Sequence, residues 1–77
     1  MKIEYLVKMA NEIGAFFAAE PNPDDAVEGI RSHLRRFWDP RMRKQLLAWF
    51  DETGGVELSP LVHQAVTSGR ELLSSGS

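Results

Sequence analysis

The sequence has no cysteine and only two histidines among its 77 residues. Disulfides are therefore excluded, and two histidines alone do not make a structural zinc site. A core of this size supports only roughly 3–5 kcal/mol of net stability. Because disulfides and a zinc site are excluded, additional stability must come from efficient helix packing or from a partner chain. The absence of cysteine also fits a cytoplasmic protein, which is the location we expect.

Long apolar runs are missing as well. None approaches the ~20 apolar residues that a membrane span requires, and charged residues interrupt the first eight positions, Met-Lys-Ile-Glu-Tyr-Leu-Val-Lys, where a signal peptide would be apolar. There is no glycine-rich phosphate loop, no His-Glu-x-x-His and no nucleophile-elbow serine. We therefore expect a globular protein without membrane contact, without a metal or cofactor of its own, and without an active site.

Three pairs of a capping residue and a proline punctuate the chain: Asn22-Pro23, Asp39-Pro40 and Ser59-Pro60. Each pair places an N-cap residue before a proline that suits the first helical position. Thr53-Gly-Gly marks a helix end, because one of the glycines can supply a left-handed cap. A helix is therefore predicted to start at each of the three cap–proline pairs.

Apolar residues at i, i+3, i+4 and i+7 spacing fill the segments between the caps. The sequence thus predicts an all-α fold, a single small bundle of four helices over about residues 3–19, 23–38, 40–52 and 60–73. Residues 1–73 form one helical domain in this prediction, and residues 74–77 a disordered tail.

Phe37 belongs to the predicted core face of the second helix. Other apolar side chains lie off the predicted core faces, among them Leu47 on the third helix. On the first helix, Tyr5, Met9 and Phe16 lie beside the main stripe, so that apolar residues cover roughly 200°, more than the ~100° that one core face needs. Either this helix is packed on two sides, or Tyr5, Met9, Phe16 and Leu47 contact another protein.

Basic residues gather in one window. Six of the nine Lys and Arg residues lie between positions 31 and 44, with Asp39 the only acid there, so this window carries a net charge of +5 and the remainder −7. Arginine and tryptophan are common at interface hot spots. The candidate protein contacts in this window are Arg35, Arg36, Trp38, Arg41 and Arg43. Local pairing, such as Arg35 stacking on Trp38, is the open alternative. Nucleic-acid binding is disfavoured, because the acidic remainder would repel phosphate.

Several segments resemble a known family. They are Lys8-Met-Ala-Asn-Glu-Ile-Gly-Ala-Phe-Phe17, His33-Leu-Arg-Arg-Phe-Trp-Asp-Pro-Arg-Met-Arg43, Gly54-Gly55 and Leu58-Ser-Pro-Leu-Val62. Over about residues 3–73, in order and with similar gaps, they are similar to the delta subunit of NAD-dependent, molybdenum-containing formate dehydrogenase.

The resemblance implies a non-catalytic accessory subunit of a cytoplasmic bacterial complex that oxidises formate and reduces NAD. The alpha subunit would hold bis-molybdopterin guanine dinucleotide and iron–sulfur clusters, and the beta subunit the FMN and NAD site. The implied role is to dock on the alpha subunit and to support complex stability or molybdenum cofactor insertion. Two alternatives stay open: a free-standing helical protein-interaction or nucleic-acid-binding regulator, and, for the isolated chain, a homodimer through the spare apolar surface.

Overall fold

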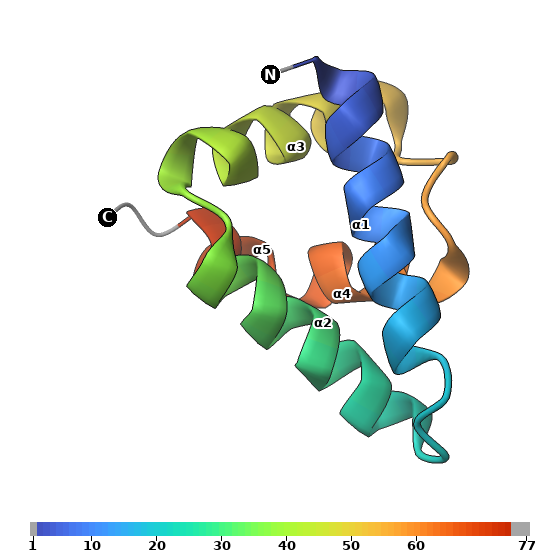
Figure 1. Cartoon of the computed structure of the whole chain (residues 1–77). Helices are drawn as coiled ribbons and strands as arrows, with labels where there is room; N and C mark the ends of the chain where they lie inside the picture. Colours follow the sequence, from blue (N-terminus) through green and yellow to red (C-terminus); the bar gives the residue numbers. More distant parts are fainter. Residues whose placement is uncertain (1, 75–77) are drawn as a thin grey trace.

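The computed structural model describes residues 2–74 and shows five helices in that range (Figure 1). In chain order they are α1 (Ile3–Phe17), α2 (Pro23–Phe37), α3 (Pro40–Thr53), α4 (Pro60–Ser68) and α5 (Arg70–Ser74). The prediction of an all-α bundle is confirmed. The segment predicted as one helix over 60–73 is divided into α4 and α5, and Ser74 ends α5 rather than beginning a tail. Residues 75–77 of the predicted tail lie outside the described residues.

The predicted starts of α2 and α3 are confirmed by their capping bonds. The Asn22 side chain accepts a hydrogen bond from the backbone N–H of Asp24 at 2.9 Å, and Asp39 accepts one from Met42 at 2.9 Å. These bonds satisfy amides that have no partner within the helix. At the other end of α3, Gly54 has the left-handed conformation (φ 81°) that glycine adopts without steric cost.

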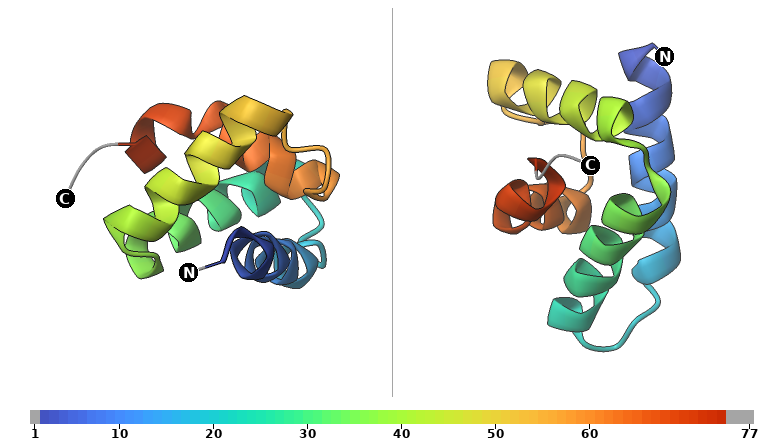
Figure 2. Two further views of the ribbon diagram at one scale, coloured as in Figure 1. Left: turned by 90° about the horizontal axis from the view of Figure 1, so that it is seen from above. Right: turned by 90° about the vertical axis from the view of Figure 1, so that its left-hand side faces the viewer.

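α1 lies in front of α4 and α5 in the view of Figure 1. The side view in Figure 2 agrees, with α1 on one side of the molecule and α4 and α5 toward the other. α2 packs on α1 and α4, and α3 packs on α1 and α5. Buried side chains from all five helices and two connections form one core: Leu6, Val7, Ala10, Val27, Ile30, Leu34, Trp38, Leu46, Leu47, Leu58, Val62, Ala65, Val66 and Leu73.

One turn of α1 holds the start of α4. The Asn11 side-chain amide donates to the backbone carbonyl of Glu57 at 3.0 Å, and its oxygen accepts from the backbone N–H of Ser59 at 2.8 Å. The Ser59 side chain makes no capping bond of its own. Three residues beyond Asn11, an added Cβ on Gly14 would lie 2.4 Å from Cγ2 of Val62. α1 therefore fixes the segment before α4 through the two Asn11 hydrogen bonds, and the absence of a side chain at Gly14 lets Val62 of α4 pack closely against α1.

Replacing Asn11 by alanine is expected to lower the free energy of unfolding by about 1–3 kcal/mol, because the part-buried Ser59 amide loses its acceptor. A urea titration followed by circular dichroism measures this. Asn11→Asp is the matched control, since it keeps an oxygen for Ser59 and should fall between the alanine variant and the wild type. An unchanged midpoint for the alanine variant would mean that other contacts hold the loop.

The division between α4 and α5 lies at Gly69. Its backbone (φ −103°, ψ 14°) leaves the helical range, while its N–H still donates to the Ala65 carbonyl at 2.8 Å. Arg31 of α2 crosses here, so that an added Cβ on Gly69 would lie 2.5 Å from its Cδ. The guanidinium of Arg31 also donates to the Ser68 hydroxyl at 2.7 Å. A contact with another helix therefore accompanies the break, and the apolar periodicity gave no sign of the break.

Phe37 and Trp38 are the reverse of what the sequence predicted. Phe37, expected in the core, is 69% exposed, whereas Trp38, expected at the surface, is 5% exposed. α2 ends at Phe37, and the backbone of Trp38 is extended (φ −85°, ψ 136°). Helical spacing therefore no longer sets the direction of the indole, which enters the core.

The buried face of α3 also differs from the prediction. Leu47 is 4% exposed and Arg43 is 2% exposed, although both were expected to contact a partner. Positions 43, 46, 47 and 50 follow one helical stripe, and α3 packs on both α1 and α5. Met42 and Trp49 are partly buried and pack against the core.

Candidate interaction surface

The predicted contact residues differ in how exposed they are to solvent in the structure. Three are buried and belong to the domain itself: Trp38, Arg43 and Leu47. Two are partly buried: Met9 and Arg35. Four are exposed: Tyr5, Phe16, Arg36 and Arg41. Binding of a partner by any of them stays a prediction, but only the exposed and partly buried ones can be reached without a rearrangement of the folded chain.

An aromatic patch, defined here as Phe16, Phe17, His33 and Phe37, joins α1 to α2. The rings of Phe16 and Phe17 meet edge to face with centroids 5.1 Å apart, Phe17 and His33 lie 6.4 Å apart, and His33 and Phe37 lie 4.7 Å apart. Such edge-on and tilted pairs are favourable arrangements for aromatic rings. The outer rings remain in solvent, since Phe16 is 75% and Phe37 69% exposed.

A glycine on α2 gives the patch its shape. An added Cβ on Gly29 would lie 2.4 Å from Cε1 of Phe17, so the Phe17 ring rests directly on the backbone of α2. Successive residues on a helix point about 100° apart. Seating Phe17 against α2 therefore leaves the neighbouring Phe16 ring outside the core.

An apolar pocket of about 290 Å³ adjoins the aromatic patch. Its lining comes from Glu12, Ile13, Phe16, Phe17 and His33. Interface hot spots commonly consist of an anchoring side chain that fills such a pocket on the partner surface. The patch therefore offers both projecting rings and a place for an incoming apolar side chain.

One arginine borders the patch. The guanidinium carbon of Arg36 lies 5.8 Å from the centroid of the Phe37 ring, a cation–π contact at an exposed site. The predicted stacking involved Arg35 and Trp38 instead. On the same helix, Arg31 is paired with Glu28, so this arginine is engaged within the fold. Arg36 is thus the basic residue that directly extends the aromatic patch.

Three members of the patch were missed by the sequence reasoning. Phe37 was placed in the core stripe of the second helix, and Phe17 and His33 were not among the candidate contacts. A usable signal was present, because Ala26, Val27, Ile30 and Leu34 already complete the stripe of α2 and leave Phe37 as its last residue. The pairing of Phe17 on α1 with His33 on α2 was not visible, because it depends on how α1 crosses α2.

Arg43 has an unusual environment for a cation. Its Nε and Nη1 atoms are buried and have no hydrogen-bond partner within residues 2–74. Burial lowers the pKa of Arg43 below its ordinary value, and the neighbouring Arg35 charge lowers it further, while Asp39 opposes both. Arg43 is therefore a core residue whose charge is poorly compensated in the isolated chain.

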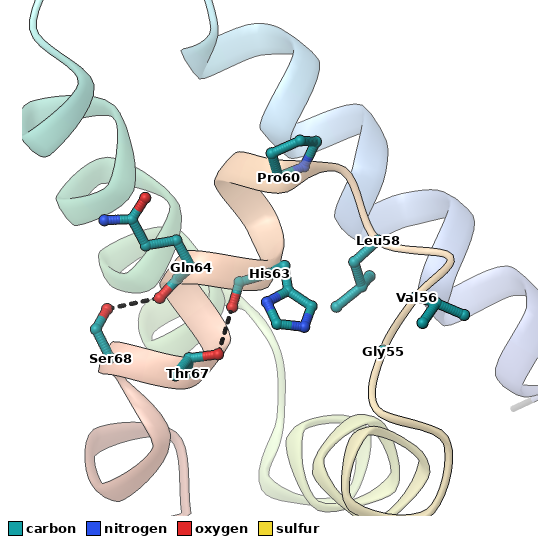
Figure 3. A pocket seen from close by; sticks show the side chains of 8 residues that line it. All are labelled: Gly55, Val56, Leu58, Pro60, His63, Gln64, Thr67 and Ser68. Carbon is teal, nitrogen blue, oxygen red and sulfur yellow. Dashed lines mark hydrogen bonds between the residues drawn. The ribbon is translucent and has the colours of Figure 1, made fainter.

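A larger hollow of about 590 Å³ lies between the segment before α4 and α4 itself (Figure 3). Its polar side chains bond to the main chain: Thr67 donates to the His63 carbonyl at 2.9 Å, and Ser68 to the Gln64 carbonyl at 2.7 Å. The His63 ring nitrogen lies 2.9 Å from the Gly54 carbonyl. Because these groups are already engaged, we assign no reaction to this hollow.

Two further searches concern the described part of the chain. Between residues 2 and 74, no three His, Asp or Glu side chains gather in a group that could hold a metal ion. Over the same range, no helix combines the length and the apolar character needed to cross a membrane.

Comparison with known proteins gives one finding. A family model described as the NADH-dependent formate dehydrogenase delta subunit matches residues 5–66, which reach from α1 into α4 and include the aromatic patch and Arg43. Neither the curated proteins nor the solved structures contain a match. The segments that carried the sequence resemblance are partners in the fold, since Asn11 and Gly14 contact the start of α4. The chain belongs to the family of NADH-dependent formate dehydrogenase delta subunits.

Proposed function

We propose that this chain is a non-catalytic accessory subunit of a cytoplasmic NADH-dependent formate dehydrogenase. It docks on the large catalytic alpha subunit and supports assembly and stability of the complex. Membership of the delta subunit family supports association with the other subunits of such a complex. The observation that carries the docking is the aromatic patch, whose outer rings Phe16 and Phe37 lie mostly in solvent.

The energetics favour a partner over this patch. Apolar surface removed from water contributes roughly 25 cal/mol per Å², and aromatic residues beside arginine are typical of interface hot spots. Arg36 next to Phe37 favours a partner surface with acidic groups, because complementary charge aligns the two chains as they meet. The proposal therefore specifies an apolar and acidic area on the alpha subunit.

We assign the cofactors of the complex to the other subunits. Bis-molybdopterin guanine dinucleotide and iron–sulfur clusters belong to the alpha subunit in this proposal, and FMN and the NAD site to the beta subunit. The delta chain has no cysteine to ligate a cluster, and its described part gathers no metal-binding group. Its support of molybdenum cofactor insertion would act through docking on the alpha subunit.

Recovery of the intact complex tests the proposal. The tagged chain is expressed in cells that make the complete formate dehydrogenase and is isolated at moderate salt. We expect the alpha subunit to co-elute in equal amount, and the eluate to reduce NAD with formate. Cells that lack the alpha subunit are the control, and should yield neither the other subunits nor the activity.

The other outcomes decide against the proposal. Recovery of nucleic acid, with binding that weakens roughly linearly in log–log form as salt rises, would indicate a regulator that neutralises phosphates. Recovery of a second copy of the chain alone would indicate a homodimer. The assembly role has its own measurement: complex purified from cells without the delta chain should contain less molybdenum per alpha subunit.

A further inference from the structure

Arg43 lacks the partners that a buried guanidinium normally has. The residue is 2% exposed, and its Nε and Nη1 atoms find no acceptor in the described part of the chain. These two atoms carry three of the five N–H donors of an arginine. Buried charges in proteins are nearly always paired and hydrogen bonded, because an unpaired one loses its hydration without compensation.

The surroundings of Arg43 add positive charge. Arg35, near the end of α2, is close enough to act on Arg43 by repulsion, and Asp39 is the opposing acid. The Asp39 carboxylate already accepts the capping bond from the Met42 amide at 2.9 Å. Arg43 also lies in the first turns of α3, where the helix dipole disfavours a cation. The junction of α2 and α3 therefore holds two guanidinium groups and one acid that is already engaged.

We propose that Arg43, with Arg35 beside it, receives a carboxylate side chain of the alpha subunit and so completes the α2–α3 junction on complex formation. This inference rests on the proposed function. A carboxylate suits the site because its two oxygens match the planar donors of a guanidinium and its charge offsets the local excess. Because Arg43 is 2% exposed in the isolated chain, the proposal requires its side chain to turn outward when the partner binds.

The test uses Arg43→Met, which keeps a long side chain and removes the charge. In the isolated chain we expect Tm to rise by about 4 °C or more, because an unpaired buried charge is lost. Binding to the alpha subunit should weaken by about 30-fold or more, as for one side of a buried charge pair. Arg43→Lys, which retains a charge without the planar donors, should weaken binding without raising Tm.

Lys44→Met is the matched control, since Lys44 is the adjacent basic residue and is exposed. It should leave Tm within about 3 °C of the wild type and the affinity nearly unchanged. Equal binding of the alpha subunit by wild type and Arg43→Met overturns the inference and leaves the proposed function standing. Failure of the wild-type chain to bind overturns both.

Two results in the isolated chain also overturn the inference. A fall in Tm for Arg43→Met would show that the guanidinium is satisfied without a partner. A rise in the wild-type Tm with inorganic phosphate but not with acetate, absent in Arg43→Met, would assign the site to a phosphate group instead of a carboxylate of the alpha subunit.

Discussion

Replacing Trp38 by alanine is expected to leave most of the chain unfolded at 25 °C. The indole is 5% exposed and belongs to the same core as Leu34 and Leu46. Truncating a buried tryptophan or phenylalanine to alanine costs roughly 3–5 kcal/mol. A core of this size supports about the same net stability in total. The loss of one side chain is therefore comparable to the stability of the whole domain.

The neighbouring residue provides the control for this prediction. Phe37→Ala removes an aromatic ring one position away that is 69% exposed, and should change the free energy of unfolding by about 0.5 kcal/mol or less. Far-UV circular dichroism and a urea titration measure both variants. If Trp38→Ala unfolds at the same urea concentration as Phe37→Ala, Trp38 does not contribute to the core.

Replacing Phe16 and Phe37 together by alanine is expected to weaken binding to the alpha subunit on the order of 100-fold, with little change in stability. The two residues are the exposed outer rings of the aromatic patch, on either side of Phe17 and His33. Central aromatic residues account for most of the binding energy at many interfaces. Their exposure in the isolated chain means that the core does not depend on them.

Titration calorimetry with the purified alpha subunit measures this loss, and a urea titration checks the fold. Val56→Ala is the control, because Val56 is an 83% exposed apolar residue between α3 and α4 and is not a member of the patch. Unchanged affinity for the double variant, or an equal loss for Val56→Ala, would place the docking surface elsewhere. Sedimentation of the isolated chain tests the predicted homodimer, which should dissociate in the double variant if the patch forms it.

Local signals predicted the helix starts well. The side chains of Asn22 and Asp39 cap amides two and three residues ahead, at 2.9 Å in each case. Proline after each cap and glycine after α3 act on their own backbone dihedrals. Every one of these effects operates within a few residues, so reading the sequence was sufficient to find them.

The candidate site was predicted only in part. Phe16 and Arg36 were expected to contact a partner, and both are exposed. Phe37 was assigned to the core because the periodicity of α2 was carried to its last residue. Leu47 was assigned to the surface because a single apolar face was assumed for the third helix, and Trp38 because tryptophan beside arginine is common at interfaces. In so small a bundle, α3 is covered on two sides, so that assumption fails.

The sequence by itself determined the all-α class, the starts of α2 and α3, and the left-handed end at Gly54, because these depend on hydrogen bonds and backbone preferences between near neighbours. Only the tertiary structure decided that Trp38 turns inward, that the aromatic patch joins α1 to α2, and that Arg43 is buried without partners. These features depend on how helices distant in the chain cross and cover one another, which no local pattern records.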